Sequence, residues 1–275
     1  MIAESKSYQI VRYVVLTAAT AFVIIPIVPL VFMAFKTGME FASSSVFAPP
    51  RNWLNGYNFA YALRVGSLFR SLLTTIIILV ISIAISVNFA CMVSFVMQRF
   101  EFKAKKLVML LFMMTMFIPV VTTQVVVFQI IYRLHLVNTI GSLILLYSGT
   151  GIVDIYITMN LLNTIPKELD EAGLLDGANY FRVYFNLILP LLKPAIITMA
   201  VLKGIGIYND FYLPNLYLIR GVQTLTLALY RFFAGLSTPF EVVSAAVLMA
   251  TIPVIILFLF AQKYIYNGLA GAVKS

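Results

Sequence analysis

The chain has 275 residues, of which 62% are hydrophobic and only 11% are charged. Soluble domains carry about 25% charged residues, so this composition excludes a soluble enzyme or carrier and indicates an integral membrane protein. The formal net charge of +9 would suggest nucleic-acid binding in a soluble chain. Here, basic residues that flank membrane spans explain it, and we expect no nucleic-acid partner.

Six apolar runs are long enough to cross a bilayer, which requires about 20 mostly apolar residues. The first run exceeds the core of about 7–15 residues found in signal peptides, so we expect it to be retained. Because a helix satisfies its own backbone groups in lipid, all six runs are predicted to be helical, with kinks at interior prolines such as Pro119 and Pro253. The runs cover residues 14–35, 71–97, 107–132, 140–165, 187–208 and 242–261.

The distribution of Lys and Arg residues predicts the orientation of these spans. With six spans both termini share one side, and that side collects the larger number of basic residues, most clearly in the short loop 99–106. Cytoplasmic loops carry such an excess. We therefore predict a cytoplasmic N-terminus (1–11), a transmembrane domain (12–265) and a cytoplasmic C-terminal tail (266–275).

Two longer segments fall on the opposite side of the predicted membrane. Residues 36–70 contain the only tryptophan, and residues 213–241 contain an apolar piece, 225–233, which is too short to span a bilayer. We predict that both segments are external, with 225–233 forming a re-entrant or interfacial helix.

Motifs for catalysis and metal binding are missing from the sequence. No Gly-rich loop ending in Lys-Ser or Lys-Thr occurs, which excludes ATP hydrolysis by the P-loop route. A single histidine, His135, cannot form a metal site with other histidines, and a single cysteine, Cys91, excludes a disulfide framework. We expect no catalytic residue, no metal and no cofactor bound by this chain.

The most polar part of the sequence is the predicted cytoplasmic segment 166–190. Pro166 suits the first position of a helix, and the acidic residues of the first two turns favour the positive end of the helix dipole. Gly177 follows Asp176 in a predicted turn, and a second short helix is expected over residues 180–185. This pattern predicts a helix–turn–helix on the membrane surface.

The charge of this segment indicates what it binds. Between residues 168 and 176 there are four acidic residues and no basic one, whereas helices that rest on lipid headgroups are usually rich in Lys and Arg. Leu174 and Leu175 are expected to share the face of Glu171. We predict that this face docks into a groove of a protein partner; an amphipathic linker resting on headgroups is the other interpretation.

The spacing of this segment carries a family resemblance. Glu171-Ala172-Gly173, three residues, Gly177, nine residues and then Leu187, Leu189 and Pro190 resemble the EAA loop of ABC importer permeases. That motif has Ala where this chain has Gly173 and Ile where it has Leu187. The flanking residues, the stretch from Tyr208 to Pro214 (with Tyr208 replacing Trp) and the tail 262–274 are similar to the six-span subunit of maltose-type sugar permeases.

The resemblance implies an all-α membrane protein with six transmembrane helices and the type I ABC importer permease fold, in a bacterial inner membrane. It implies a pore-forming subunit of an ATP-driven, binding-protein-dependent importer of a sugar or oligosaccharide. The implied partners are a homologous second permease, two copies of a cytoplasmic ABC ATPase that uses ATP and Mg, and an external solute-binding protein. The segment 166–190 would be the coupling loop that contacts the ATPase, through Glu171, Ala172, Gly173, Leu174, Asp176 and Gly177.

Charged residues at membrane depth suggest where a solute passes. Such charges are costly in lipid and usually face a cavity or each other, and the glycines that follow Lys203 weaken its helix. We hypothesise that Lys203 and Asp154 face the path and pair with each other, although neutralisation of Asp154 in a structural role explains them equally well. Near Asp210, the side chains of Tyr208 and Asn209 suit hydroxyl-rich ligands, but interhelical packing is an alternative.

Two other functions remain open at this stage. A permease of the same class could carry a different polar solute. An ion-coupled secondary transporter would need no ATPase and would use the charged residues at membrane depth to bind its coupling ion.

Overall fold

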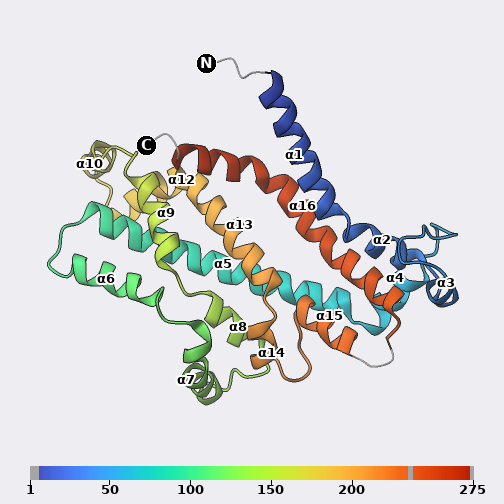
Figure 1. Cartoon of the computed structure of the whole chain (residues 1–275). Helices are drawn as coiled ribbons and strands as arrows, with labels where there is room; N and C mark the ends of the chain where they lie inside the picture. The colour runs from blue at the N-terminus through green and yellow to red at the C-terminus, as the bar shows by residue number, and fades with distance from the viewer. Residues whose placement is uncertain (1–5, 235–237, 273–275) are drawn as a thin grey trace. The chain divides into compact units, whose positions relative to one another are not determined.

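The computed structural model of the protein describes residues 6–234 and 238–272, and this part of the chain is helical with no β-strand (Figure 1). Residues 1–5 and 273–275 of the predicted termini, and 235–237 of the predicted external segment, lie outside the described residues. The helices are α1 (Lys6–Ile24), α2 (Ile27–Phe35), α3 (Gly38–Ser43), α4 (Tyr57–Val65), α5 (Leu68–Arg99), α6 (Lys105–Thr115), α7 (Val120–Arg133), α8 (Ile140–Tyr147), α9 (Ile152–Leu162), α10 (Glu168–Leu175), α11 (Tyr180–Val183), α12 (Leu189–Leu191), α13 (Lys193–Asn209), α14 (Tyr212–Tyr217), α15 (Leu225–Ala234) and α16 (Phe240–Ala272), with a π-helical turn η1 (Tyr184–Ile188) between α11 and α12.

The chain divides into two compact units. One unit comprises residues Met1–Arg70 and Ala228–Pro253, and the other comprises Ser71–Leu227 and Val254–Ser275. In the first unit, the ammonium group of Lys36 is buried after α2 and donates to Ser44 Oγ (2.9 Å) and the Ser45 carbonyl (2.7 Å). The Asn58 amide, on α4, donates to the carbonyls of Ala34 and Lys36. Side chains therefore satisfy the carbonyls that the end of α2 leaves free.

The apolar core of the second unit is built along α5. One buried cluster joins α5, α9 and α13 to the segment after α10, and a second joins α5 to α7, α8, α14 and α15. Hydroxyl groups on α5 also bond to backbone carbonyls, from Ser86 to Gly149 (2.8 Å) and from Ser94 to Ile155 (3.0 Å). Small polar side chains of this kind hold membrane helices together where lipid supplies no hydrophobic driving force.

The predicted spans coincide with helices, but three of them are broken. Residues Tyr8–Phe35 and Leu68–Arg99 form long apolar helices, as expected for the first two spans. The third is divided into α6 and α7, which meet at 102°, the fourth into α8 and α9 at 49°, and the fifth into Tyr180–Leu191 and Lys193–Asn209 at 71°. Counting each bent pair as one span gives up to five by length and composition.

The sixth predicted span lies in α16, a single helix of 33 residues. Pro253 lies inside this helix, and α16 continues to Ala272. Of the prolines expected to cause kinks, Pro119 stands at the sharpest break, directly before α7. The kink expected at Pro119 is thus a full break between two helices, because proline removes a backbone donor and disfavours a helical residue before it.

Candidate functional site

The polar segment 166–190 folds as the predicted helix–turn–helix. Helix α10 begins at Glu168 and not at Pro166, and it ends in a glycine turn in which Gly177 has φ = +82°. The Gly177 N–H donates to the Leu174 carbonyl and the Ala178 N–H to the Gly173 carbonyl, as in a Schellman motif. Asn179 then caps α11 by accepting from the N–H of Arg182. Local sequence alone accounts for this turn.

A buried ion pair fixes α10 to the end of α5. Arg99 Nε lies 2.6 Å from Asp170 Oδ2, and Arg99 also donates to the Ile165 carbonyl (3.0 Å). Burial raises the pKa of the Asp170 carboxyl above its ordinary value, while the Arg99 guanidinium acts in the opposite direction. Asp170 therefore serves the fold, and the acids that remain exposed on this segment are Glu168, Glu171 and Asp176.

The predicted coupling residues divide into an exposed set and an inward set. Glu171, Ala172, Asp176 and Gly177 are exposed, whereas Gly173 is buried. Leu174 packs against the apolar core, so the expectation that both leucines share the outer face was wrong. Leu175 does lie outside, with 89% of its surface exposed.

Phe181 was not anticipated as part of this surface. Its side chain is 73% exposed on the second helix of the segment. The resulting surface combines acidic groups with large apolar side chains, of which Leu175 and Phe181 are the most exposed. An aromatic residue in a polar turn region was the only signal in the sequence that could have indicated it.

A polar cluster surrounds the break between α8 and α9. The Gly149 carbonyl accepts from Ser86 Oγ and from Lys203 Nζ (2.9 Å), and the Gly151 N–H donates to Asp154 Oδ2 (3.1 Å). Lys203 Nζ lies 3.1 Å from Asp154 Oδ2, so the two residues do form a pair. Irregular backbone at membrane depth must be satisfied internally, and this pair contributes to that.

Beside this break lies a cavity of about 540 Å³, lined by Lys203, Asn209 and Asp210 among the predicted path residues. Tyr147 and Gly149 also line it and were not predicted. Tyr147 donates to Asp210 Oδ2 (2.7 Å), and the other Asp210 oxygen accepts from the Tyr212 N–H. These contacts join α8 to the chain after α13.

The remaining path residues do not line this cavity. Asp154 is not part of the lining, but it pairs with Lys203, which is. Tyr208 is buried and does not line the cavity. The Asn209 amide donates to the Ile205 carbonyl of its own helix (2.9 Å). Among the described residues no group of His, Cys, Asp and Glu is arranged to hold a metal ion.

Comparison with known proteins identifies the family. Residues 90–270 match the family described as binding-protein-dependent transport system inner membrane component. The chain is 34% identical over 245 residues to a probable starch degradation products transport system permease protein, AmyC of Thermoanaerobacterium thermosulfurigenes, covering 88% of each chain. It is 32% identical to the melibiose/raffinose/stachyose import permease protein MelC of Bacillus subtilis (strain 168), covering 99% of each.

Among solved structures, the fold is similar to a chain of a bacterial ABC transporter involved in the import of the acidic polysaccharide alginate. The TM-score is 0.84 at 21% identity, covering 96% of this chain and 99% of that one. This match confirms the expected type I permease fold, and the family excludes the ion-coupled secondary transporter. The chain belongs to the binding-protein-dependent transport system inner membrane component family and is a permease subunit of an ABC importer.

Proposed function

We propose that this chain is the pore-forming subunit of an ATP-driven importer of a sugar or oligosaccharide. The observation that carries the solute class is the similarity, over nearly the whole chain, to permeases named for starch degradation products and for melibiose, raffinose and stachyose. A permease for another polar solute is the competing possibility.

The proposed assembly follows from the family. A homologous permease completes the pore, two ABC ATPases supply energy with ATP and Mg, and an external solute-binding protein delivers the solute. The chain itself binds no cofactor and lies in the bacterial inner membrane with both termini in the cytoplasm. The Arg99–Asp170 pair supports this topology, because it joins the most basic loop to the segment 166–190 on one side of the membrane.

The exposed surface of the segment 166–190 is proposed to contact the ATPase. Glu171 supplies a free carboxylate, and Leu175 and Phe181 supply apolar side chains that can enter a groove. Gly173, Leu174 and the Arg99–Asp170 pair anchor the segment to the core of the second unit. Movement of the ATPase is thereby transmitted to α5 and α13, the helices on which that core is built.

The cavity beside Lys203 is proposed to lie on the solute path. Its polar groups are hydroxyl, amide and carboxylate, and the positive charge of Lys203 is balanced by Asp154. This composition suits a neutral, hydroxyl-rich solute, because each polar group can pair with a hydroxyl.

Reconstitution tests the proposal. The permease pair and its ATPase are placed in proteoliposomes, and uptake of radiolabelled sugars and ATP hydrolysis are measured with a panel of solute-binding proteins. Glu171→Lys is expected to abolish uptake while the complex still inserts; Glu101→Lys, at an exposed residue in another predicted cytoplasmic loop, is the matched control. Normal uptake by Glu171→Lys would contradict the coupling role, and stimulation only by a protein that carries a solute other than a sugar would contradict the solute class.

A further inference from the structure

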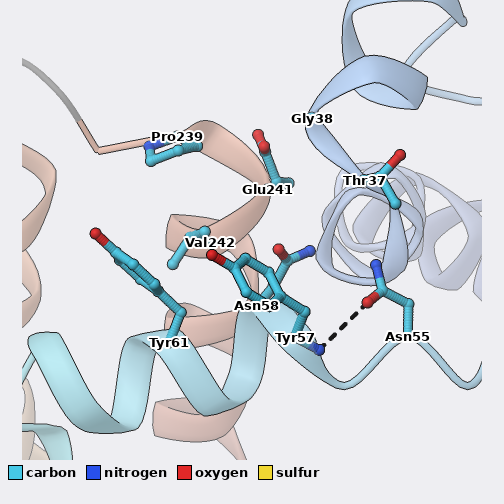
Figure 2. A pocket seen from close by; sticks show the side chains of 9 residues that line it. All are labelled: Thr37, Gly38, Asn55, Tyr57, Asn58, Tyr61, Pro239, Glu241 and Val242. Carbon is cyan, nitrogen blue, oxygen red and sulfur yellow. Dashed lines mark hydrogen bonds between the residues drawn. The ribbon is translucent and has the colours of Figure 1, made fainter.

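The first unit contains a cavity of its own, of about 360 Å³ (Figure 2). Residues 37–61 supply one part of its lining and residues 239–242 the other, so it joins the two segments that the sequence predicts to be external. Its polar lining residues are Thr37, Asn55, Tyr57, Asn58, Tyr61 and Glu241.

Glu241 is the unusual member of this lining. It lies in the first turn of α16 and is only 7% exposed. Over the described residues, no hydrogen bond or ion pair reaches its carboxylate. A Cβ atom on Gly38 would lie 2.9 Å from Glu241 Oε1, so a glycine is needed for the carboxylate to approach α3 this closely.

The two amides that line the cavity are engaged by the chain around it. The Asn58 amide donates to the carbonyls of Ala34 and Lys36, and the Asn55 amide donates to the Phe35 carbonyl. The Asn55 oxygen accepts from the Tyr57 N–H, as the dashed line in Figure 2 shows. The Asn58 amide has no hydrogen left for Glu241. The second N–H of Asn55 and the hydroxyls of Thr37, Tyr57 and Tyr61 form no hydrogen bond to Glu241 among the described residues, and all four groups are neutral, so the lining supplies no counter-charge.

A buried carboxylate without a partner is costly, and buried charges in proteins are normally paired. The group that completes this cavity therefore carries a positive charge and hydrogen-bond donors, as an ammonium or guanidinium does. Tyr57 and Tyr61, whose ring centroids are 6.1 Å apart, line the same cavity. Tyrosine rings attract such cations through their faces. The negative charge of Glu241 and the two tyrosine rings therefore both favour a cation in this cavity.

The surroundings indicate that the cation belongs to a protein. Residues adjacent in sequence to the lining carry exposed apolar side chains: Met39, Leu54 (91% exposed) and Phe240. Protein interfaces combine such apolar surface with a few anchoring side chains, of which Arg is among the most frequent. The cavity is at the small end of the range of about 300–1,000 Å³ for ligand sites, which suits one side chain better than an oligosaccharide.

We propose that this cavity is a socket for one Lys or Arg side chain of the external solute-binding protein, with Glu241 as its counter-ion. The assignment rests on the proposed function, which supplies that partner and places residues 36–70 and 213–241 outside. It adds a specific anchoring contact that fixes where the partner docks.

The test uses the reconstituted complex and the solute-binding protein that stimulates its ATPase activity. The quantity measured is the concentration of that protein needed for half-maximal stimulation. Glu241→Gln keeps the shape of the side chain and removes the charge, and it is expected to raise this concentration about tenfold or more and to weaken its dependence on salt. Glu40→Gln, in the other external segment (36–70) and outside the cavity lining, is the control and should behave as the wild type.

A second pair of variants covers the possibility that Glu241→Gln disturbs folding. Tyr57→Lys supplies an internal ammonium that competes for Glu241, whereas Tyr57→Met removes the ring and supplies none. Tyr57→Lys should need about tenfold more solute-binding protein than Tyr57→Met. Equal values for these two variants, or an unchanged value for Glu241→Gln, would overturn the socket while leaving the importer function intact. A wild-type complex that no solute-binding protein stimulates would overturn both.

The source of the cation is tested separately with n-butylamine and n-butanol at equal concentration. n-Butanol is the uncharged comparison. If n-butylamine, but not n-butanol, raises the melting temperature of the wild-type complex and the solute-binding protein has no effect on that shift, the site takes a free amine and the proposed partner is wrong. If the solute-binding protein abolishes the shift, the two compete for one site, as the socket requires.

Discussion

Gly173 and Leu187 are the two positions at which this chain departs from the EAA motif that it resembles, and the structure places them in contact. A Cβ atom on Gly173 would lie 2.8 Å from Leu187 Cδ1 and 3.2 Å from Val183 Cγ2, whereas carbon atoms in good contact are about 3.5–4.0 Å apart. The motif has Ala and Ile at these positions. We therefore expect the two departures to compensate for each other.

The magnitudes follow from packing. Gly→Ala in a helix stabilises by about 1 kcal/mol, but overpacking a filled site costs about 1–3 kcal/mol. Gly173→Ala alone should therefore destabilise by about 0–2 kcal/mol net, and Leu187→Ile alone should cost less than about 1.5 kcal/mol. The effects of substitutions at residues in contact deviate from additivity by about 0.5–3 kcal/mol. The double variant should therefore be more stable, by an amount in this range, than the sum of the two single effects predicts.

The assay is unfolding of the purified protein in mixed micelles, followed by circular dichroism, for the wild type, both single variants and the double variant. Gly206→Ala is the control, because nothing lies within 4 Å of a Cβ atom at that position in α13. Additivity of the two substitutions within about 0.3 kcal/mol would refute the compensation. So would a Gly173→Ala variant stabilised as much as the Gly206→Ala control.

Three further predictions concern the segment 166–190 and the polar break. Asp170→Ala leaves the Arg99 charge buried without its partner and should lower the free energy of unfolding by about 3–5 kcal/mol in the same assay. The double variant Asp170→Leu, Arg99→Met should recover most of this loss. An Asp170→Ala variant as stable as the wild type would contradict the anchoring role. Gly177→Ala forces an L-residue to φ = +82° and should cost about 1–2 kcal/mol, which increased hydrogen exchange across α10 would report. Lys203→Met should destabilise by leaving Asp154 unpaired; if adding Asp154→Leu restores stability and also full sugar uptake, the pair is structural and has no role in the path.

The sequence by itself determined the class of the protein and the local form of the segment 166–190. Apolar runs show where helices can lie in a membrane, since the bilayer imposes a length and a composition on adjacent residues. The turn at Gly177 depends on one residue that tolerates positive φ, so it is visible in the sequence. Pro119 marks the sharpest break for a similar reason, although the sequence does not give its angle.

Only the tertiary structure decided which residues meet across long separations in the chain. It pairs Asp170 with Arg99, turns Leu174 into the core, and brings Tyr147 to Asp210, none of which follows from spacing along a helix. The physical reason is that these contacts depend on how helices pack and where they bend.

The same reason applies to the two cavities. The cost of their charges in lipid suggests that Lys203 and Asp154 pair, but only the structure shows Lys203 Nζ 3.1 Å from Asp154 Oδ2. Glu241 showed nothing unusual in the sequence, where it is one acid at the start of an apolar run. Its lack of a counter-charge becomes visible only when residues 37–61 are folded around it and contribute no basic side chain to the cavity.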